Sequence, residues 1–456
     1  MIKYFFEDIV SKNDGFLRGP FGGALKKDIF VDKSSNTYKV YEQGVILNKD
    51  SRLGNYYITK EYFDKSMYRF VANPKDILVS CSGVNYGAIY QLPENSEVGV
   101  INQALLRIRL NTDIVDDKYF IYLFENLISK RIIGGSGDST IPNFPPMNFI
   151  RKVPVELPDL ITQQKIASVL SALDDKIELN DRINTELEAM AKTLYDYWFV
   201  QFDFPVSGTL ASTPLSQQSV AERERNNVVE RKGVMVAERS RGYKSSGGKM
   251  VYNETLKREI PEGWEVKKLE ELGNFKNGVN YNPSNPGNIP CPIINVRNIS
   301  GSSYFIKNED LDIIYLNEND VKKYSVNENS IIVARSGIPG ATRLISDFSE
   351  NTLYCGFAIH YEIYNPLFKN KVFFYLKSLE ELIKNGSGGT IMKNVNQQLL
   401  NNLIISIPEK SILSAFNRKI DIIFKKINNL EKQNQELSAL RDWLLPMLMN
   451  GQVKVE

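Results

Sequence analysis

The sequence predicts an α+β protein with two α/β domains separated by a long antiparallel two-helix coiled coil. Two observations predict this fold. Two helical stretches repeat one another 250 positions apart, as Lys176 and Lys426 do. A similar glycine-rich loop precedes each stretch, at 135–141 and at 386–391. A period this long indicates the duplication of a whole domain rather than a solenoid, so we expect the halves to be related by a pseudo-twofold.

Each α/β domain, 1–159 and 260–409, shows the same order of elements. The predicted strands are rich in apolar and β-branched residues and lie between Pro, Asn and Gly. Each predicted amphipathic helix is followed by glycine, which can adopt the left-handed conformation at a helix end. The predicted strands are 71–80, 98–110, 330–334 and 354–364, and the predicted helices are 117–133 and 367–383.

Two long helices, 160–202 and 410–456, are predicted to form the spacer. Each follows a proline, Pro158 or Pro408, that closes a strand-like run. Apolar residues recur at steps of three and four, which is the pattern of a coiled-coil seam. Equivalent asparagines interrupt both seams, either as a buried device that sets register or as a solvated polar turn. The seam residues are Leu170, Leu173, Ile177, Asn184, Leu187 and Leu194 in the first helix, and Ile420, Ile423, Ile427, Asn434, Leu437 and Leu444 in the second.

Residues 203–259 are predicted to be a linker. They contain a Ser/Thr/Gln stretch and the charge-dense run 222–232, and they close on 243–249. This composition is too polar for a core.

The composition fits a cytoplasmic protein. Among 456 residues, 42% are hydrophobic and 24% are charged, and no long uncharged apolar run predicts a membrane span. Acidic residues in the short apolar stretch at the N-terminus argue against a signal peptide. Cys81, Cys291 and Cys355 are widely spaced and fit free thiols better than a disulfide framework or a zinc site.

The sequence contains no complete catalytic motif, so we expect a chain that binds rather than reacts, with no metal site. Imidazole metal sites need more than one histidine, and most serine or cysteine hydrolases need one beside the nucleophile. The single histidine, His360, lies in a strand-like run that reads as buried. The run 247–250 lacks the other residues of a phosphate-binding loop. The run 143–147 resembles the adenine-methyltransferase signature, but Phe144 separates the asparagine from the prolines.

Loops that recur in both halves carry residues suited to reading DNA. Ser, Asn and Gln bond base edges or phosphates, and Arg pairs with guanine through two hydrogen bonds. Net charge is only +2, so we expect a partner to share the phosphate contacts. The candidate DNA-binding residues are Arg18, Lys26, Asn48, Arg52, Ser82, Asn85, Tyr86, Ser139, Thr140, Asn143, Arg297, Asn298, Arg335, Ser336, Thr390, Lys393, Asn394, Asn396 and Gln397.

Several stretches together resemble the specificity subunits of type I restriction–modification systems, and the resemblance covers nearly the whole chain. The matching stretches are 16–25, 163–170, 194–199, 243–250 and 260–264. Two features depart from the family pattern: the segment 209–241 is longer and more charged, and the second helix ends in 443–447 without the Trp198-Phe199 pair of the first.

The resemblance implies two target-recognition domains, 1–159 and 260–409, that each read half of a bipartite, asymmetric site in double-stranded DNA. Two modification subunits, which are adenine methyltransferases, and two restriction subunits, which are motor nucleases, are the implied partners. The chain itself would have no catalytic activity and bind no cofactor. S-adenosylmethionine, ATP and Mg²⁺ would be bound by the partners, and the helix pair would set the gap between half-sites.

Two other functions remain open. A coiled-coil adaptor between proteins would show no salt-dependent DNA binding. A stand-alone DNA modification enzyme would need a methyl-donor site and an intact signature at 143–147, and the sequence lacks both.

Overall fold

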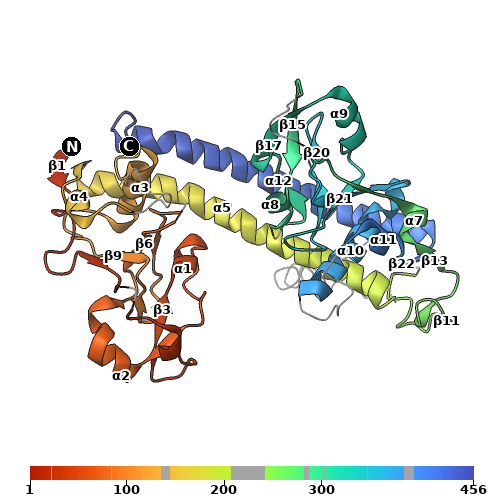
Figure 1. Ribbon diagram of the computed structural model, residues 1–456, viewed down its shortest axis with the longest axis horizontal. Helices are drawn as coiled ribbons and strands as arrows, with labels where there is room; N and C mark the ends of the chain where they lie inside the picture. The colour runs from red at the N-terminus through yellow and green to blue at the C-terminus, as the bar shows by residue number, and fades with distance from the viewer. Residues whose placement is uncertain are drawn as a thin grey trace, which may run out of the picture. The chain divides into compact units, whose positions relative to one another are not determined.

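In the computed structural model, the chain separates into two compact units (Figure 1). Unit 1 comprises Met1–Leu179 and Gln433–Glu456, and unit 2 comprises Asn180–Lys432. Each unit therefore contains part of both long helices. The structure describes residues 1–21, 23–83, 85–134, 144–206, 242–281, 287–301, 303–346, 348–384 and 395–455.

Unit 1 contains two four-stranded sheets and a separate antiparallel strand pair, β1–β10. One sheet, called the larger sheet after its five-stranded counterpart in unit 2, has the order β2-β9-β6-β7 and is antiparallel throughout. The second sheet has the order β4-β3-β8-β5 and includes the parallel pair β3–β8. The strands are β1 (Ile2–Phe5), β2 (Phe16–Arg18), β3 (Thr37–Tyr41), β4 (Tyr57–Thr59), β5 (Val71–Ala72), β6 (Ile77–Ser80), β7 (Ile89–Gln91), β8 (Gly99–Ile101), β9 (Leu105–Ile108) and β10 (Pro154–Leu157).

Unit 2 repeats this plan. Its larger sheet has the order β14-β21-β18-β19-β16, its second sheet has the order β17-β15-β20, and β13 pairs with β22. The hairpin β11–β12 precedes them. The strands are β11 (Met250–Asn253), β12 (Arg258–Pro261), β13 (Glu265–Lys268), β14 (Gly273–Asn277), β15 (Ile289–Ile294), β16 (Phe305–Ile306), β17 (Asp312–Leu316), β18 (Ser330–Ala334), β19 (Thr342–Ile345), β20 (Leu353–Tyr354), β21 (Ala358–Ile363) and β22 (Ile404–Ile407).

The duplication is visible in the pairing of the strands. The run β2-β9-β6-β7 corresponds to β14-β21-β18-β19, and the parallel pair β3–β8 corresponds to β15–β20. The register agrees as well, because Leu78 pairs with Arg107 in unit 1 and Ile332 pairs with His360 in unit 2. The two units therefore contain two copies of one fold, and the predicted fold class is confirmed.

Short helices cover the sheets. Side-chain caps begin α3 and α11, among others: Asp116 accepts a hydrogen bond from the Tyr119 N–H, and Asn396 accepts one from the Leu399 N–H, both at 2.9 Å. The helices are α1 (Gln43–Leu47), α2 (Lys60–Tyr62), α3 (Asp117–Ser129), α4 (Met147–Arg151), α7 (Leu269–Leu272), α8 (Val296–Ile299), α9 (Glu318–Tyr324), α10 (Lys369–Lys384) and α11 (Gln397–Asn401).

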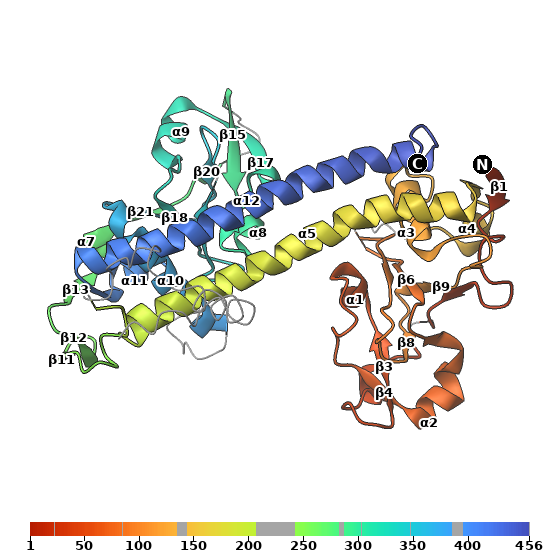
Figure 2. The ribbon, with the colours of Figure 1, turned by 180° about the vertical axis from the view of Figure 1, so that it is seen from behind.

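The long helices are α5 (Leu160–Tyr195) and α12 (Lys410–Met449), which run antiparallel inside each unit (Figure 2). In unit 1, Ile166 and Leu170 share a core with Leu444 and Leu448. In unit 2, the residues 250 positions away take the same places, and the ring of Phe416 lies 5.7 Å from that of Trp198. Every residue of the predicted seam is buried or half-buried.

Both ends of the predicted linker belong to the core of unit 2. Beyond α5, the chain continues as the π-helix η4 (Asp196–Val200) into an aromatic cluster. The ring of Phe204 lies 4.8 Å from that of Tyr243 and 5.5 Å from that of Trp264. Because the segment as a whole is polar, its sequence did not predict that Phe204 and Tyr243 pack in this core. Residues 209–241 lie outside the described residues.

Three predicted strands are each divided in two, because the chain crosses from one sheet to the other within them. The run 71–80 contains β5 and β6, the run 98–110 contains β8 and β9, and the run 354–364 contributes to β20 and β21. Only 330–334 coincides with a single strand, β18. Across the described ranges, no helix has the length and apolar character that a membrane span requires.

Candidate nucleic-acid interface

Three segments of unit 1 meet at one end of its larger sheet. The Cys81 N–H, just after β6, donates to the carbonyl of Ala104 at 2.7 Å. The Gly19 N–H, just after β2, donates to the carbonyl of Leu105 at 2.9 Å. We call this the loop edge of unit 1, and its described residues are 18–21, 81–83, 85–87 and 102–104.

The same backbone arrangement recurs in unit 2. The Arg335 N–H, just after β18, donates to the carbonyl of Phe357 at 2.9 Å. The Gly278 N–H, just after β14, donates to the carbonyl of Ala358 at 3.1 Å. The loop edge of unit 2 comprises 277–281, 335–340 and 355–357.

Glycine at matched positions shapes the turn of each loop edge. Gly87 and Gly340 have φ of 83° and 85°, where a side chain would be strained. Their N–H groups donate back to the carbonyls of Ser80 and Ala334 at 2.8 and 2.9 Å. A Cβ on either would lie within 2.7 Å of an isoleucine from the neighbouring helix. The turns are therefore fixed in shape, while the side chains between the glycines differ.

Six of the predicted DNA-binding residues lie on the loop edges. Asn85 and Arg335 are exposed, and the other four are half-buried. Among the described residues, the Arg335 guanidinium forms no ion pair. An unpaired, exposed guanidinium is suited to bonding a phosphate or a guanine edge. The six residues are Arg18, Ser82, Asn85, Tyr86, Arg335 and Ser336.

Other predicted residues have partners within their own domain. Arg52 forms an ion pair with Asp50 at 2.9 Å, and the Asn48 amide caps α1 by donating to the Gly44 carbonyl at 2.8 Å. The Asn396 side chain is the cap of α11, and Gln397 is the half-buried first residue of that helix. Lys26 is exposed in the turn before residues 27–29. The structure does not bring these residues onto the loop edges.

The second glycine-rich loop of each half is largely outside the described residues. This holds for Ser139, Thr140, Asn143, Thr390, Lys393 and Asn394. The first described residue after the loop of unit 1 is Phe144, whose N–H donates to the Cys81 carbonyl at 2.9 Å. The chain therefore leaves this loop at the loop edge.

The family model for the type I restriction modification DNA specificity domain matches residues 21–189 and 261–437. The two matched ranges together cover most of the chain. The first contains the loop edge of unit 1 except residues 18–20, and the second contains the whole loop edge of unit 2. The chain belongs to this family of specificity subunits. The match also locates the duplication, since each range includes one recognition domain and most of the long helix that follows it.

Individual relatives agree with the family. The type I restriction enzyme HindI specificity subunit of Haemophilus influenzae is 27% identical over 387 residues, which cover 78% of this chain and 81% of that protein. The MjaIX specificity subunit of Methanocaldococcus jannaschii is 27% identical over 413 residues, covering 88% and 82%. The crystal structure of the S subunit from M. genitalium matches with a TM-score of 0.47 and 14% identity, covering 98% of this chain and 95% of that one.

Gln43 of the specificity subunit was not predicted from the sequence, although it organises the loop edge of unit 1. Gln43, the first residue of α1, donates through Nε2 to the Ser80 hydroxyl at 2.8 Å and to the Ser82 carbonyl at 2.7 Å. These bonds connect α1 to the turn after β6, which carries the candidate residues Ser82 and Asn85. No local pattern marks Gln43, because its partners lie almost 40 positions along the chain.

Arg297 and Asn298 lie in an acid-lined hollow of about 810 Å³ in unit 2. The Arg297 guanidinium pairs with Asp312 at 2.6 Å, and the Asn298 amide donates to the Asp310 carbonyl at 2.9 Å. Carboxylates repel phosphates, so these surroundings disfavour contact with the DNA backbone. The acidic lining residues are Asp181, Glu188, Glu309, Asp310, Asp312 and Glu431.

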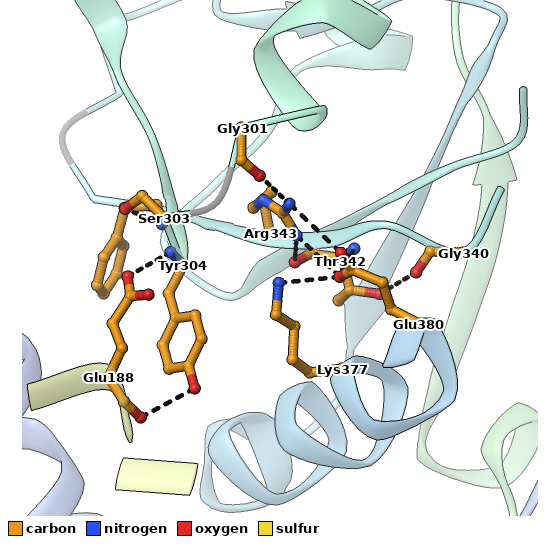
Figure 3. Close-up of polar contacts among 10 residues, drawn as sticks. Glu188, Gly301, Ser303, Tyr304, Gly340, Thr342, Arg343, Lys377 and Glu380 are labelled. Atoms are coloured by element: carbon orange, nitrogen blue, oxygen red, sulfur yellow. Dashed lines mark hydrogen bonds and ion pairs between the residues drawn. The ribbon is translucent and has the colours of Figure 1, made fainter. Parts of the chain in front are cut away.

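A segment of unit 2, whose described residues are Gly301, Ser303 and Tyr304, links its larger sheet to the long helices (Figure 3). The Tyr304 N–H donates to the Glu188 carboxylate at 2.6 Å, and the Tyr304 hydroxyl donates to the Glu188 carbonyl at 3.0 Å. The Ser303 hydroxyl donates to Glu431 of α12 at 3.2 Å. Burial raises the pKa of the Glu188 carboxyl.

The other side of this segment is held by a buried ionic group. Arg343 of β19 donates to the Gly301 carbonyl and to Glu380 of α10, the latter at 2.9 Å. Lys377 also donates to Glu380 at 2.9 Å (Figure 3). Arg343 and Glu380 are each 1% exposed. Buried charges need such partners, and here they fix the segment that contacts the long helices.

The described residues contain no group of His, Cys, Asp and Glu arranged to hold a metal ion. Cys81, Cys291 and Cys355 are buried, unpaired thiols, and burial raises the pKa of Cys81 to about 12. A thiol that stays protonated is a poor nucleophile.

Proposed function

We propose that this specificity subunit reads a bipartite, asymmetric site in double-stranded DNA, one half with each loop edge. The observation that carries the proposal is the repeated loop edge inside a chain of the specificity-domain family. The backbone of the loop edge is shared and Ser82 matches Ser336, but other side chains differ: Arg335 of unit 2 stands where unit 1 has Cys81, and Asn85 of unit 1 lies in a turn that carries Pro339 in unit 2. Different side chains on one frame favour different half-sites.

The proposal assigns all chemistry to partners. Two modification subunits would methylate adenine with S-adenosylmethionine, and two restriction subunits would cleave with ATP and Mg²⁺. The small net charge of +2 supports this division, because a protein that held DNA alone would need a stronger phosphate clamp. The cytoplasm is the expected compartment, since the substrate is DNA inside the cell.

Single-molecule methylation sequencing tests this function. DNA is compared from cells that carry the modification subunit with and without this chain. We expect a split, adenine-methylated motif that is present only with this chain, and its two parts are the half-sites. An unchanged methylome would contradict the proposal. Salt-insensitive binding of the purified complex to DNA would favour the coiled-coil adaptor instead.

Arg335 gives the residue-level test. We expect Arg335→Ala to weaken binding of the complex by about 1–3 kcal/mol and to relax base preference in one half-site only. Arg52→Ala is the matched control, because Arg52 is exposed but paired with Asp50 away from the loop edge. Dissociation constants at one fixed salt concentration measure both. Equal losses for the two variants would argue against the loop edge as the reading surface.

A further inference from the structure

The loop edge of unit 2 presents an aromatic side chain to solvent beside Arg335. Phe357 is 63% exposed, and its carbonyl accepts the Arg335 N–H at 2.9 Å. The exposed ring therefore belongs to the residue that is bonded through its backbone to Arg335, whose guanidinium is free of ion pairs among the described residues. Single exposed apolar residues are common on protein surfaces, but Phe357 lies on the loop edge and its backbone is held in place.

The backbone around Phe357 is fixed from three sides. Besides the bond to Arg335, the Gly356 N–H donates to the Val279 carbonyl at 2.8 Å, and the Ala358 N–H donates to the Cys355 carbonyl at 2.9 Å. A Cβ on Gly356 would lie 1.9 Å from the Asn280 side-chain oxygen, so this glycine permits the close approach of the two segments. Phe357 thus has only its two side-chain torsions free, which keeps the entropy cost of a contact low.

The equivalent positions of unit 1 lack this pair. The bond from Arg335 to Phe357 corresponds to the bond from Cys81 to Ala104. Cys81 is fully buried and Ala104 is small. The frame therefore does not require an exposed arginine or an exposed aromatic residue at these positions. A change confined to side chains on a shared frame is what a change of DNA specificity requires.

The chemistry of the pair matches neighbouring features of the major groove. Arginine bonds the O6 and N7 atoms of guanine, and a phenyl ring makes apolar contact with the C5 methyl group of thymine. We propose that Phe357 contacts a thymine methyl group in the half-site that unit 2 reads, beside the base pair that Arg335 reads. This inference rests on the proposed DNA-reading function and names a specificity-determining residue for it.

Deoxyuridine substitution tests the contact, because deoxyuridine is thymidine without the C5 methyl group. The complex with its modification subunits is titrated with DNA of the site found by methylation sequencing, and each thymine is replaced singly. We expect one position in one half-site at which deoxyuridine weakens binding about fourfold, the usual effect of one buried methyl group. Phe357→Ala should bind thymine and deoxyuridine at this position equally.

The matched control is Phe21→Ala. Phe21 is 98% exposed on the loop edge of unit 1, so this variant should keep the fourfold discrimination at the position that Phe357 reads. Phe357→Leu, which retains an apolar side chain, should keep part of it. Thermal unfolding should be unchanged in each variant, since neither ring is part of a core.

Three results would overturn the inference: a half-site without thymine, equal binding of every deoxyuridine probe by the unaltered chain, or undiminished discrimination by Phe357→Ala. A ring that wedges between bases would give a different result: Phe357→Ala would lose affinity equally for all probes. The fluorescence of 2-aminopurine, a base analogue that brightens when it is unstacked, would then rise near the site with the unaltered chain but not with this variant. A complex that does not bind the site at all contradicts the proposed function instead.

Discussion

The two recognition domains share a backbone frame but carry different buried residues at one matched position of the larger sheet. Arg107 of β9 and His360 of β21 occupy the same place in the register of their sheets. Arg107 is 0% exposed and pairs with Asp14, while Arg109 of the same strand pairs with Asp76 at 2.7 Å. His360 is 3% exposed and packs edge-on against Tyr354. Strand pairing and the glycine turns hold the frame, so its interior can be charged in one copy and neutral in the other.

The domains also differ in how they hold the long helices. In unit 1, Asp174 of α5 accepts the Tyr122 hydroxyl at 2.6 Å and pairs with Arg441 of α12 at 2.7 Å. The side chains of Asp174 and Arg441 remain about one-third exposed. In unit 2, Ser303 and Tyr304 contact the long helices, and the buried Arg343–Glu380 pair holds the neighbouring Gly301. The domain thus contacts the long helices through a partly exposed ion pair in one copy and through a segment held by a buried ion pair in the other, and the two contacts should respond very differently to mutation.

The largest effect is expected from Glu380→Leu in unit 2. This change leaves the Arg343 guanidinium buried and without its carboxylate, and such a loss costs about 3–5 kcal/mol. Hydrogen exchange of peptides from β18, β19 and α10 measures it as a fall in the free energy of local opening, while the sheets of unit 1 should be unaffected.

Glu381→Gln is the control for that variant. Glu381 is the next residue of α10, but it is half-exposed and pairs with Lys192 at 3.6 Å. Its loss should cost less than about 1 kcal/mol. Similar exchange in both variants would mean that the buried pair does not stabilise this contact.

An intermediate effect is expected from pH, again in unit 2 alone. Burial lowers the pKa of His360 to about 4 from its usual 6.5, and the neighbouring Glu362 and Lys276 act in opposite directions. The unfolded chain therefore binds a proton below pH 6.5 that the folded chain binds only near pH 4. The free energy of unfolding is therefore unaffected by this titration above pH 6.5. It falls as the pH is lowered towards 4, by about 3 kcal/mol in total.

His360→Leu isolates this titration. His360 Nε2 has no hydrogen-bond partner among the described residues, so leucine leaves no group newly unpaired there. The difference in unfolding free energy between the two chains should change between pH 7 and pH 5, whereas the carboxylates common to both cancel. A difference that stays constant over this range would show that His360 is not held neutral by burial.

The sequence predicted the duplication because it depends on local patterns. The seam repeats at a fixed offset, and the strand at 330–334 is one uninterrupted apolar run that ends in its glycine turn. The sheet crossings inside 71–80 and 98–110 were missed, since apolar residues continue through them and only long-range pairing decides which sheet each half joins.

The candidate site was predicted less completely, for a related reason. The sequence shows only that Arg297 and Arg335 are arginines in loops. In the structure, Arg297 pairs with Asp312, which lies 15 positions away, whereas Arg335 has no ion pair among the described residues. Phe357 was predicted to lie within a strand, 354–364. In the structure it lies on the loop edge, just before β21, and its ring is exposed. Burial and pairing across strands therefore separate reading residues from structural ones.

The smallest effect is expected at the partly exposed contact of unit 1. Asp174→Asn removes the charge that Arg441 pairs with and weakens the bond from Tyr122, and a partly exposed ion pair of this kind contributes about 1 kcal/mol. A double-mutant cycle with Arg441→Gln should give a coupling free energy of that size, which decreases as salt is added. Tyr122→Phe controls for the hydroxyl, whose contribution should be insensitive to salt. A coupling as large as that of the buried pair in unit 2 would show that solvent exposure does not distinguish the two contacts, and the comparison between the domains would lose its physical basis.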